Sequence, residues 1–309
     1  MLRLFPIVLF IVGACGTDLT ADKACSDLAT TRCTQLMTCS ATDLQKRWAD
    51  VATCETREKL ACTDGLAVPA SAASPSTVDA CSSALATQAC DASLSGVDSP
   101  TACLPQAGSA ANAAACSFAA QCASTFCAIT STALCGVCAT TPAAGTSCAA
   151  QGCGPTLVCS TDMVCVAPVA AQGACSKTMP CGAGLSCVGS TMTISGTCMA
   201  EGATAGATCD PRRMTAAGCN AADGLTCDTS TKTCVAEPLV AAGQPCGLIG
   251  TTVTGCLGGA SCIATPTSST CVAAATDGAA CDAVNGPFCE FPARCVANTC
   301  QLPGSTTCN

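Results

Sequence analysis

The segment GATCDPRRMTAAGCNAADGLTCDTSTKTC, residues 206–234, decides the fold of the region around it. It contains four cysteines, and its only large apolar side chains are one methionine and one leucine. A unit of this size cannot bury a hydrophobic core of its own, and small exported domains compensate with disulfides. We therefore expect two bridges to close the segment, although the sequence leaves their pairing open.

The same group of four cysteines recurs along residues 143–309. Successive groups begin 27, 34, 37 and 35 residues apart, and several open with Gly-x-x-Cys, as at Gly145. A fixed period of this length is typical of a repeat architecture, here predicted as tandem short β-hairpins or irregular loops. The groups are Cys148, Cys153, Cys159 and Cys165; Cys175, Cys181, Cys187 and Cys198; Cys209, Cys219, Cys227 and Cys234; Cys246, Cys256, Cys262 and Cys271; and Cys281, Cys289, Cys295 and Cys300.

The composition places the chain among small disulfide-rich proteins. Its 309 residues include 35 cysteines but only one Trp, six Phe and no Tyr. Burial contributes about 25 cal/mol per Å² of apolar surface, so a chain rich in Ala gains little from a conventional core. Cysteines at this density indicate an oxidising compartment and therefore an exported protein.

Residues 18–105 are predicted to form an α-helical bundle linked by disulfides. Apolar residues and cysteines recur there at three- and four-residue spacing, which predicts a first helix ending near Cys39. Up to four bridges would join the eight cysteines of this region, which are Cys25, Cys33, Cys39, Cys54, Cys62, Cys81, Cys90 and Cys103.

Two further helices are expected in the same region. One would start at an N-cap on Ser40 or Thr42 and continue to a stop at Gly65. The other would start at Ser76 or Thr77, after a linker rich in Pro, Ser and Ala. Trp48 falls on the apolar face of the second helix, where a lone Trp is more often a packing residue than a ligand contact.

Residues 106–142 form a short cysteine-rich segment with an odd number of cysteines, so at least one must pair outside it. Cys308, which belongs to no group of four, is a candidate by arithmetic alone. The segment includes CGVC, Cys135 to Cys138, a spacing that can form a thiol–disulfide redox centre. Its surroundings lack the βαβ pattern of such centres, and we favour a structural role. A Cys₄ zinc site would need thiolates that an oxidising compartment disfavours.

The chain begins with MLRLFPIVLFIVGAC, which has the layout of a signal peptide. Arg3 precedes a short apolar run, and small residues then lead to Cys15, as in a bacterial lipobox. Residues 1–14 are therefore predicted to be a lipoprotein signal peptide, and Cys15 to carry the lipid. Setting Cys15 aside leaves 34 cysteines, an even number. Residue 16 is Gly and not Asp, which by resemblance to Gram-negative lipoproteins implies sorting to the outer membrane and not retention in the inner membrane. We therefore expect an outer-membrane, cell-surface or extracellular location.

The layout as a whole resembles a set of myxobacterial-type lipoproteins. These combine a lipobox, a helical segment with eight cysteines, a CGVC element and a string of four-cysteine groups similar to the Dickkopf N-terminal domain. The resemblance rests on cysteine spacing over most of residues 1–300. It implies an architecture rather than an activity.

Several chemistries are excluded by what the sequence lacks. There is no histidine, which removes Ser-His-Asp and Cys-His catalysis and His-ligated zinc. The net charge is −8 with no basic stripe, which argues against nucleic-acid binding. The densest acidic group alternates with basic residues, as on a solvated helix face. That group is Asp43, Asp50, Glu55, Glu58 and Asp64.

Three functional hypotheses remain, and none calls for a cofactor. The first is a non-enzymatic, lipid-anchored structural or interaction protein, built as a stalk or an interaction module, which predicts an extended particle. Its protein partner or surface ligand is unknown. The second is a secreted inhibitor or ligand-binding module, with the loops Asp210–Arg213 and Phe291–Arg294 presenting a basic residue. The third and least favoured is an extracellular redox enzyme that uses CGVC.

Overall fold

The computed structural model describes residues 19–95, 99–130, 132–149, 152–265, 268–304 and 308. The predicted signal peptide and the lipidation site at Cys15 lie outside these residues. Among the described helices, none is both long enough and apolar enough to cross a bilayer.

The N-terminal region is helical, as predicted, and four disulfides link it. Its helices are α1 (Ala21–Cys39), α2 (Ala41–Trp48), α3 (Val51–Ala67), α4 (Pro75–Leu85), α5 (Cys90–Ser95) and the 3₁₀ helix η1 (Thr101–Cys103). The bridges are Cys25–Cys62, Cys33–Cys54, Cys39–Cys90 and Cys81–Cys103. Because two of them join α1 to α3, these two helices form the centre of the bundle.

The prediction of one continuous second helix is wrong. Ser40 is the N-cap of α2, as expected, but the chain turns at Ala49, whose φ is 66°. The Asp50 carboxylate then accepts a hydrogen bond from the Thr53 amide and starts α3 as a separate helix. The expected stop at Gly65 is also wrong, because α3 continues for two more residues. This second helix start bends the chain beside Trp48.

After the helices the chain forms short strands in small sheets, which confirms the predicted hairpins. The strands are β1 (Ala115–Cys116), β2 (Cys127–Ala128), β3 (Gly136–Cys138), β4 (Val158–Cys159), β5 (Cys165–Val166), β6 (Ala174–Cys175), β7 (Leu185–Val188), β8 (Gly196–Ala200), β9 (Leu225–Cys227), β10 (Cys234–Ala236), β11 (Leu239–Val240), β12 (Gly247–Ile249), β13 (Thr252–Cys256), β14 (Ser261–Ala264), β15 (Ser269–Val272), β16 (Arg294–Val296) and β17 (Thr299–Gln301). Two 3₁₀ turns, η2 (Ala119–Gln121) and η3 (Ala221–Asp223), lie between them. All strand pairs are antiparallel except β11 with β13.

Six segments, which we call units 1 to 6, share one disulfide pattern. In each, the first of four cysteines bonds the third and the second bonds the fourth. The units are residues 113–138, 145–165, 172–198, 206–234, 243–271 and 278–300. Their bridges are Cys116–Cys127 and Cys122–Cys138; Cys148–Cys159 and Cys153–Cys165; Cys175–Cys187 and Cys181–Cys198; Cys209–Cys227 and Cys219–Cys234; Cys246–Cys262 and Cys256–Cys271; and Cys281–Cys295 and Cys289–Cys300.

The odd cysteine of the middle segment is Cys135. Without it, Cys116, Cys122, Cys127 and Cys138 form a unit like the five that follow. The odd number of cysteines in the segment hid this likeness in the sequence. Cys135 bonds Cys308, across a sequence separation of 173. The count of cysteines had left that pairing open.

The units also share a backbone geometry. In all six, the third and fourth cysteines are direct partners across a hairpin. The residue three before the first cysteine has a positive φ, and its N–H donates to the carbonyl of the fourth cysteine at 2.7–2.9 Å. Four units have glycine at this position, which suits a positive φ, whereas Ala113 and Gln172 occupy it in units 1 and 3.

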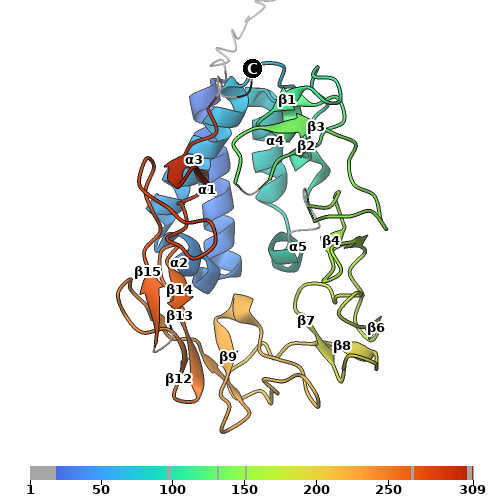
Figure 1. Cartoon of the computed structure of the whole chain (residues 1–309), viewed down its shortest axis with the longest axis vertical. Coiled ribbons are helices and arrows are strands. Elements are labelled where there is room, and N and C mark those ends of the chain that lie inside the picture. The colour runs from blue at the N-terminus through green and yellow to red at the C-terminus, as the bar shows by residue number, and fades with distance from the viewer. Residues whose placement is uncertain are drawn as a thin grey trace, which may run out of the picture.

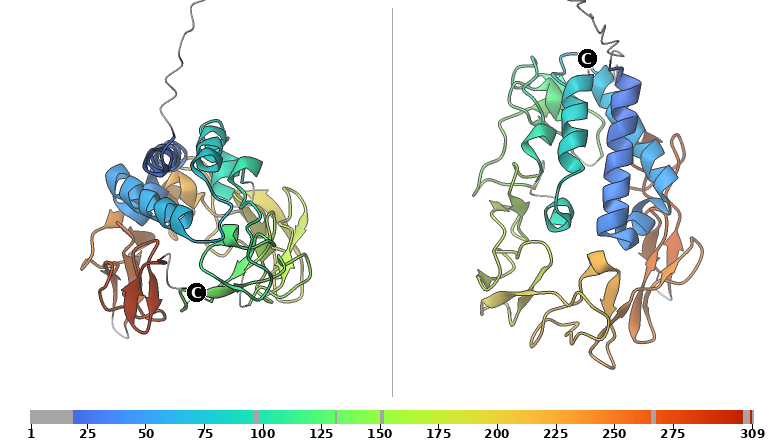
Figure 2. Two further views of the ribbon diagram at one scale, coloured as in Figure 1. Left: turned by 90° about the horizontal axis from the view of Figure 1, so that it is seen from above. Right: turned by 180° about the vertical axis from the view of Figure 1, so that it is seen from behind.

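The units follow a curved path around the helices and do not extend away from them. Figure 1 shows the chain passing from unit 1, in green, down one side, across the bottom and back up the other side to the C-terminus. The views from above and behind in Figure 2 show the same return. Since Cys308 bonds Cys135 in unit 1, the path closes on itself. The expectation of an extended particle is therefore wrong.

The shared positive φ gives a test of the unit geometry. A Cβ at Gly243, where φ is 85°, would meet no atom within 4 Å, so Gly243→Ala adds only backbone strain. We expect this variant to lose about 1 kcal/mol of stability, and Gln172→Gly to gain about 0.5 kcal/mol as strain is relieved. Thermal unfolding with the disulfides intact measures both. Shifts of the same sign in the two variants would contradict the shared geometry.

Candidate functional site

Units 4 and 5 dock on helix α2 through polar backbone contacts. The Ser40 hydroxyl, which caps α2, also donates to the Ala222 carbonyl of unit 4. At the other end of α2, the Gly258 and Gly259 amides of unit 5 donate to the carbonyls of Gln45 and Lys46, at 2.9 and 2.6 Å. Both carbonyls lie in the last turn of α2, where helix carbonyls run out of partners within the helix, although the Gln45 carbonyl also accepts from the Ala49 amide at 3.0 Å.

The two glycines are required by this close approach. Both have positive φ, 65° at Gly258 and 73° at Gly259. A Cβ on Gly258 would lie 3.3 Å from the Cβ of Ala49, the residue at which the helices bend. The bend and the glycine pair therefore fit each other, although they are far apart in the sequence.

Unit 6 and the residues before it dock on α3 through Arg57. Its guanidinium forms a two-pronged ion pair with Asp277, with both N–O distances 2.8 Å. It also donates to the Glu290 carbonyl at 3.0 Å and to the Phe291 carbonyl. The fork geometry suits arginine and not lysine. The Arg57 side chain is only 11% exposed, so the prediction that these charges lie on a solvated helix face is wrong for this residue.

A pocket of about 350 Å³ lies where these docked parts meet. It takes its walls from the bend between α2 and α3, from units 5 and 6, and from Ala274 in the segment between these two units. The lining residues are Arg47, Trp48, Thr53, Arg57, Glu58, Gly258, Gly259, Ala274, Cys289, Glu290 and Phe291. A concave site with mostly apolar walls and a few polar groups is typical of small-ligand sites.

An aromatic pair forms the apolar part of the pocket. The rings of Trp48 and Phe291 meet edge to face, with centroids 5.8 Å apart and an interplanar angle of 75°. Trp48 also packs against the buried cluster of Cys33, Leu44 and Cys54, as predicted. Its second contact, with Phe291, was missed because nothing in the sequence places residues 48 and 291 together.

The charges around the pocket are paired, with one exception. Glu58 accepts from Arg32 at 2.9 Å, and Glu290 lies 3.8 Å from Arg57. Arg47 is exposed, and among the described residues no carboxylate oxygen lies within 4.0 Å of its guanidinium. The charge available to a ligand is therefore the positive charge of Arg47.

The acidic group noted in the sequence is dispersed and mainly structural. Asp50 caps α3, Glu58 pairs with Arg32, and Asp43 lies in the first turn of α2. Asp64 lies further along α3, and its Oδ2 atom is buried without a hydrogen-bond partner among the described residues. Burial raises the pKa of Asp64, and the charge of Asp277 raises it further.

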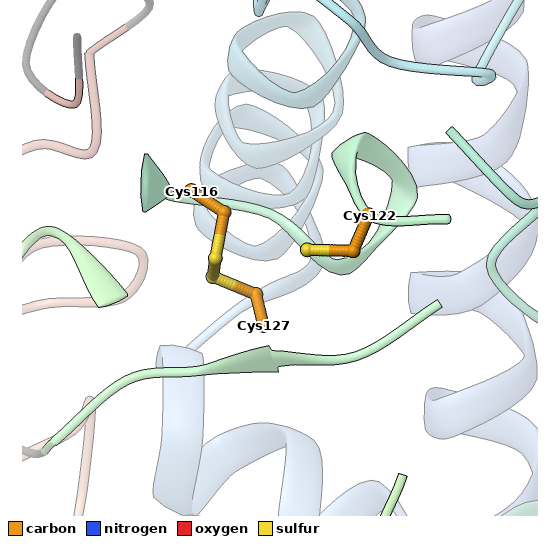
Figure 3. Close-up of side chains that lie close together, drawn as sticks. All are labelled: Cys116, Cys122 and Cys127. Carbon is orange, nitrogen blue, oxygen red and sulfur yellow. A yellow bond between two sulfur atoms is a disulfide. The ribbon is translucent and has the colours of Figure 1, made fainter. Parts of the chain in front are cut away.

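The CGVC cysteines do not form one bridge. Cys135 bonds Cys308, and Cys138 bonds Cys122, so the motif cannot cycle between a dithiol and its own disulfide. Sulfurs do cluster within 4.8 Å in the units, as Figure 3 shows for Cys116, Cys122 and Cys127. The sulfurs in that picture belong to two separate disulfides and offer no thiolate for a metal.

In both loops proposed for an inhibitor, local structure holds a basic residue: Arg213 lies in a turn, and Arg294 begins strand β16. In the loop Asp210–Arg213, the Asp210 carboxylate accepts from three backbone amides, and Arg213 has a φ of 54°. These hydrogen bonds lower the pKa of Asp210 to about 2. In the loop Phe291–Arg294, Arg294 donates to the Ala133 carbonyl of unit 1 and is half-buried. Proteins that bind an extended chain pair with it as a strand, which the turn at Arg213 does not allow.

No protein-family model, no curated protein and no solved structure matches this chain.

The Arg57 contact should carry much of the docking of unit 6. We expect Arg57→Ala to lower the free energy of unfolding by about 2 kcal/mol, because charge-assisted hydrogen bonds are lost and Asp277 is left unpaired. Arg57→Lys should restore less than half of that loss. Urea unfolding with intact disulfides measures both, with the exposed Arg212→Ala as control. A lysine variant as stable as the wild type would contradict this role.

Asp64 gives a pH-dependent test. A pKa raised on folding means that the ionised carboxylate opposes folding at neutral pH and that this cost vanishes on protonation. We expect Asp64→Asn to raise the melting temperature at pH 7 by a few degrees, with the gain disappearing as the pH falls to about 3. Glu55→Gln removes the same charge from the same helix and should have little effect. An equal gain for Asp64→Asn at both pH values would contradict the raised pKa.

Proposed function

We propose that this chain is a non-enzymatic, exported interaction protein of the cell envelope, anchored by a lipid on Cys15. The observation that carries the proposal is the pairing of 34 cysteines in 17 disulfides, which indicates an exported, extracellular-type protein. Since the sequence contains 35 cysteines, this pairing leaves no other cysteine for Cys15. That arithmetic supports lipidation.

The arrangement of the chain supports a binding role over a catalytic one. The units are rigid, cross-linked segments held on a helical bundle, and the pocket at their junction has an aromatic wall and a free cation. Its carboxylates are held in ion pairs with arginines. A preformed surface of this kind suits recognition, because little conformational entropy is lost on binding.

The resemblance to bacterial lipoproteins with Dickkopf-like cysteine groups belongs to the same proposal. It agrees with an envelope location and supplies no activity. A ligand-binding module, the second candidate from the sequence, is favoured by the pocket between α2, α3 and the last two units.

The anchor is tested by expressing the full chain in a Gram-negative host with a radiolabelled fatty acid. We expect the wild type to take up label, to fractionate with membranes and to have an intact mass that begins at Cys15 with lipid attached. Cys15→Ser should lose the label and leave the membrane fraction, while its other 34 cysteines stay oxidised.

Gly13→Ala serves as a control, because it keeps a small residue before the cleavage point. An unlabelled wild type, or one whose mass shows Cys15 in a disulfide, would contradict the anchor. Free thiols in the purified wild type would contradict the proposal of a fully cross-linked, non-enzymatic protein.

A further inference from the structure

Two aromatic side chains line the pocket at the helix bend and remain partly exposed to solvent there. The chain has only one Trp and six Phe, so each large side chain is valuable for packing. Phe291 nevertheless remains 48% exposed and Trp48 is partly exposed, with both rings facing the same pocket. Large apolar surface left open in a concave site is typical of ligand contact.

The charges select the kind of ligand. The Arg57 guanidinium is occupied by Asp277 and by two backbone carbonyls. Glu58 accepts a hydrogen bond from Arg32, and Glu290 lies 3.8 Å from the Arg57 guanidinium, whose charge it shares with Asp277. Arg47, at the end of α2, is the lining residue whose charge has no counter-ion among the described residues. A guanidinium in this position binds a carboxylate with two parallel hydrogen bonds.

The volume limits the size of the ligand. About 350 Å³ is at the lower end of the range for small-molecule sites and accommodates one aromatic or branched apolar group with a short chain. We propose that the pocket between α2, α3 and units 5 and 6 binds an apolar group bearing a carboxylate, with the apolar part on Trp48 and Phe291 and the carboxylate on Arg47. Such a group comes either from a free aryl or alkyl acid or from the last residue of a peptide.

This inference deepens the proposed interaction role and does not depend on the lipid. It can fail while Cys15 is lipidated, and it can hold in a chain that lacks the anchor. The two outcomes are therefore read from different experiments.

Trp48 is a direct reporter of occupancy. It is the only Trp, and the chain has no Tyr, so the intrinsic fluorescence of the folded protein comes from the wall of the pocket. The full-length protein in detergent is titrated with 4-phenylbutyrate, and equilibrium dialysis measures binding independently of the fluorescence. The neutral 4-phenylbutanol and the cationic 4-phenylbutylamine have the same apolar part with a different head group.

We expect saturable binding of the carboxylate, at least tenfold tighter than binding of the alcohol or the amine. Arg47→Gln should weaken carboxylate binding about tenfold and leave alcohol binding unchanged. Phe291→Ala should weaken both. Arg212→Gln, an exposed arginine outside the lining, is the matched control and should behave as wild type. Circular dichroism and the count of free thiols check that each variant is folded.

A second arm distinguishes the two sources of the ligand. Acetyl-Gly-Gly-Phe with a free carboxylate is compared with its amide and with 4-phenylbutyrate. Tighter binding of the free-acid peptide assigns the site to peptide C-termini, and tighter binding of phenylbutyrate assigns it to small acids.

The proposal is overturned by any of three results. The first is the absence of saturable binding of both carboxylates by fluorescence and by dialysis. The second is equal or tighter binding of the alcohol or the amine. The third is carboxylate binding that Arg47→Gln does not change.

Discussion

Disulfide pairing of first with third and second with fourth cysteine is the constraint on which the rest of this structure depends. In the units the buried clusters consist mainly of the cysteines themselves, as with Cys116, Cys122 and Cys138. The third and fourth cysteines face each other across a hairpin, yet each bonds a cysteine from the first half of its unit. The two bridges thereby hold the first part of each unit against its hairpin without a conventional hydrophobic core. This arrangement allows Ala, Thr and Gly to occupy most other positions, because their side chains need not supply the stability.

Units built this way contain few large apolar side chains for packing, and polar contacts help to fix where they lie. Arg57 joins α3 to the residues around unit 6, and Lys46 joins α2 to Glu237 at 2.6 Å between units 4 and 5. The Cys135–Cys308 bridge closes the path. Charged residues of the helices thus dock the units, a role that apolar helix faces have in most proteins.

The sequence predicts the elements of this fold better than their arrangement. Spacing and composition predict the helical region, the four-cysteine groups and the oxidising compartment, because each depends on residues close together in the chain. They fail at Ala49, where the Asp50 cap starts a new helix inside an apolar pattern that continues across the bend. They also fail for unit 1, because Cys135 lies among its four cysteines and makes the group look like five. The pocket could not be predicted, since Trp48 and Phe291 meet only after the units have turned back.

A disulfide, a hydrogen bond and an ion pair connect the lining residues of the pocket to unit 6. Cys289 lines the pocket and bonds Cys300, whose carbonyl accepts a hydrogen bond from Gly278 at 2.8 Å. Gly278 follows Asp277, the partner of Arg57, and Arg57 is itself a lining residue. A displacement of the aromatic wall would therefore strain a bridge, a hairpin and an ion pair together. A wall held in this way is preorganised, and any ligand that binds to it costs little conformational entropy.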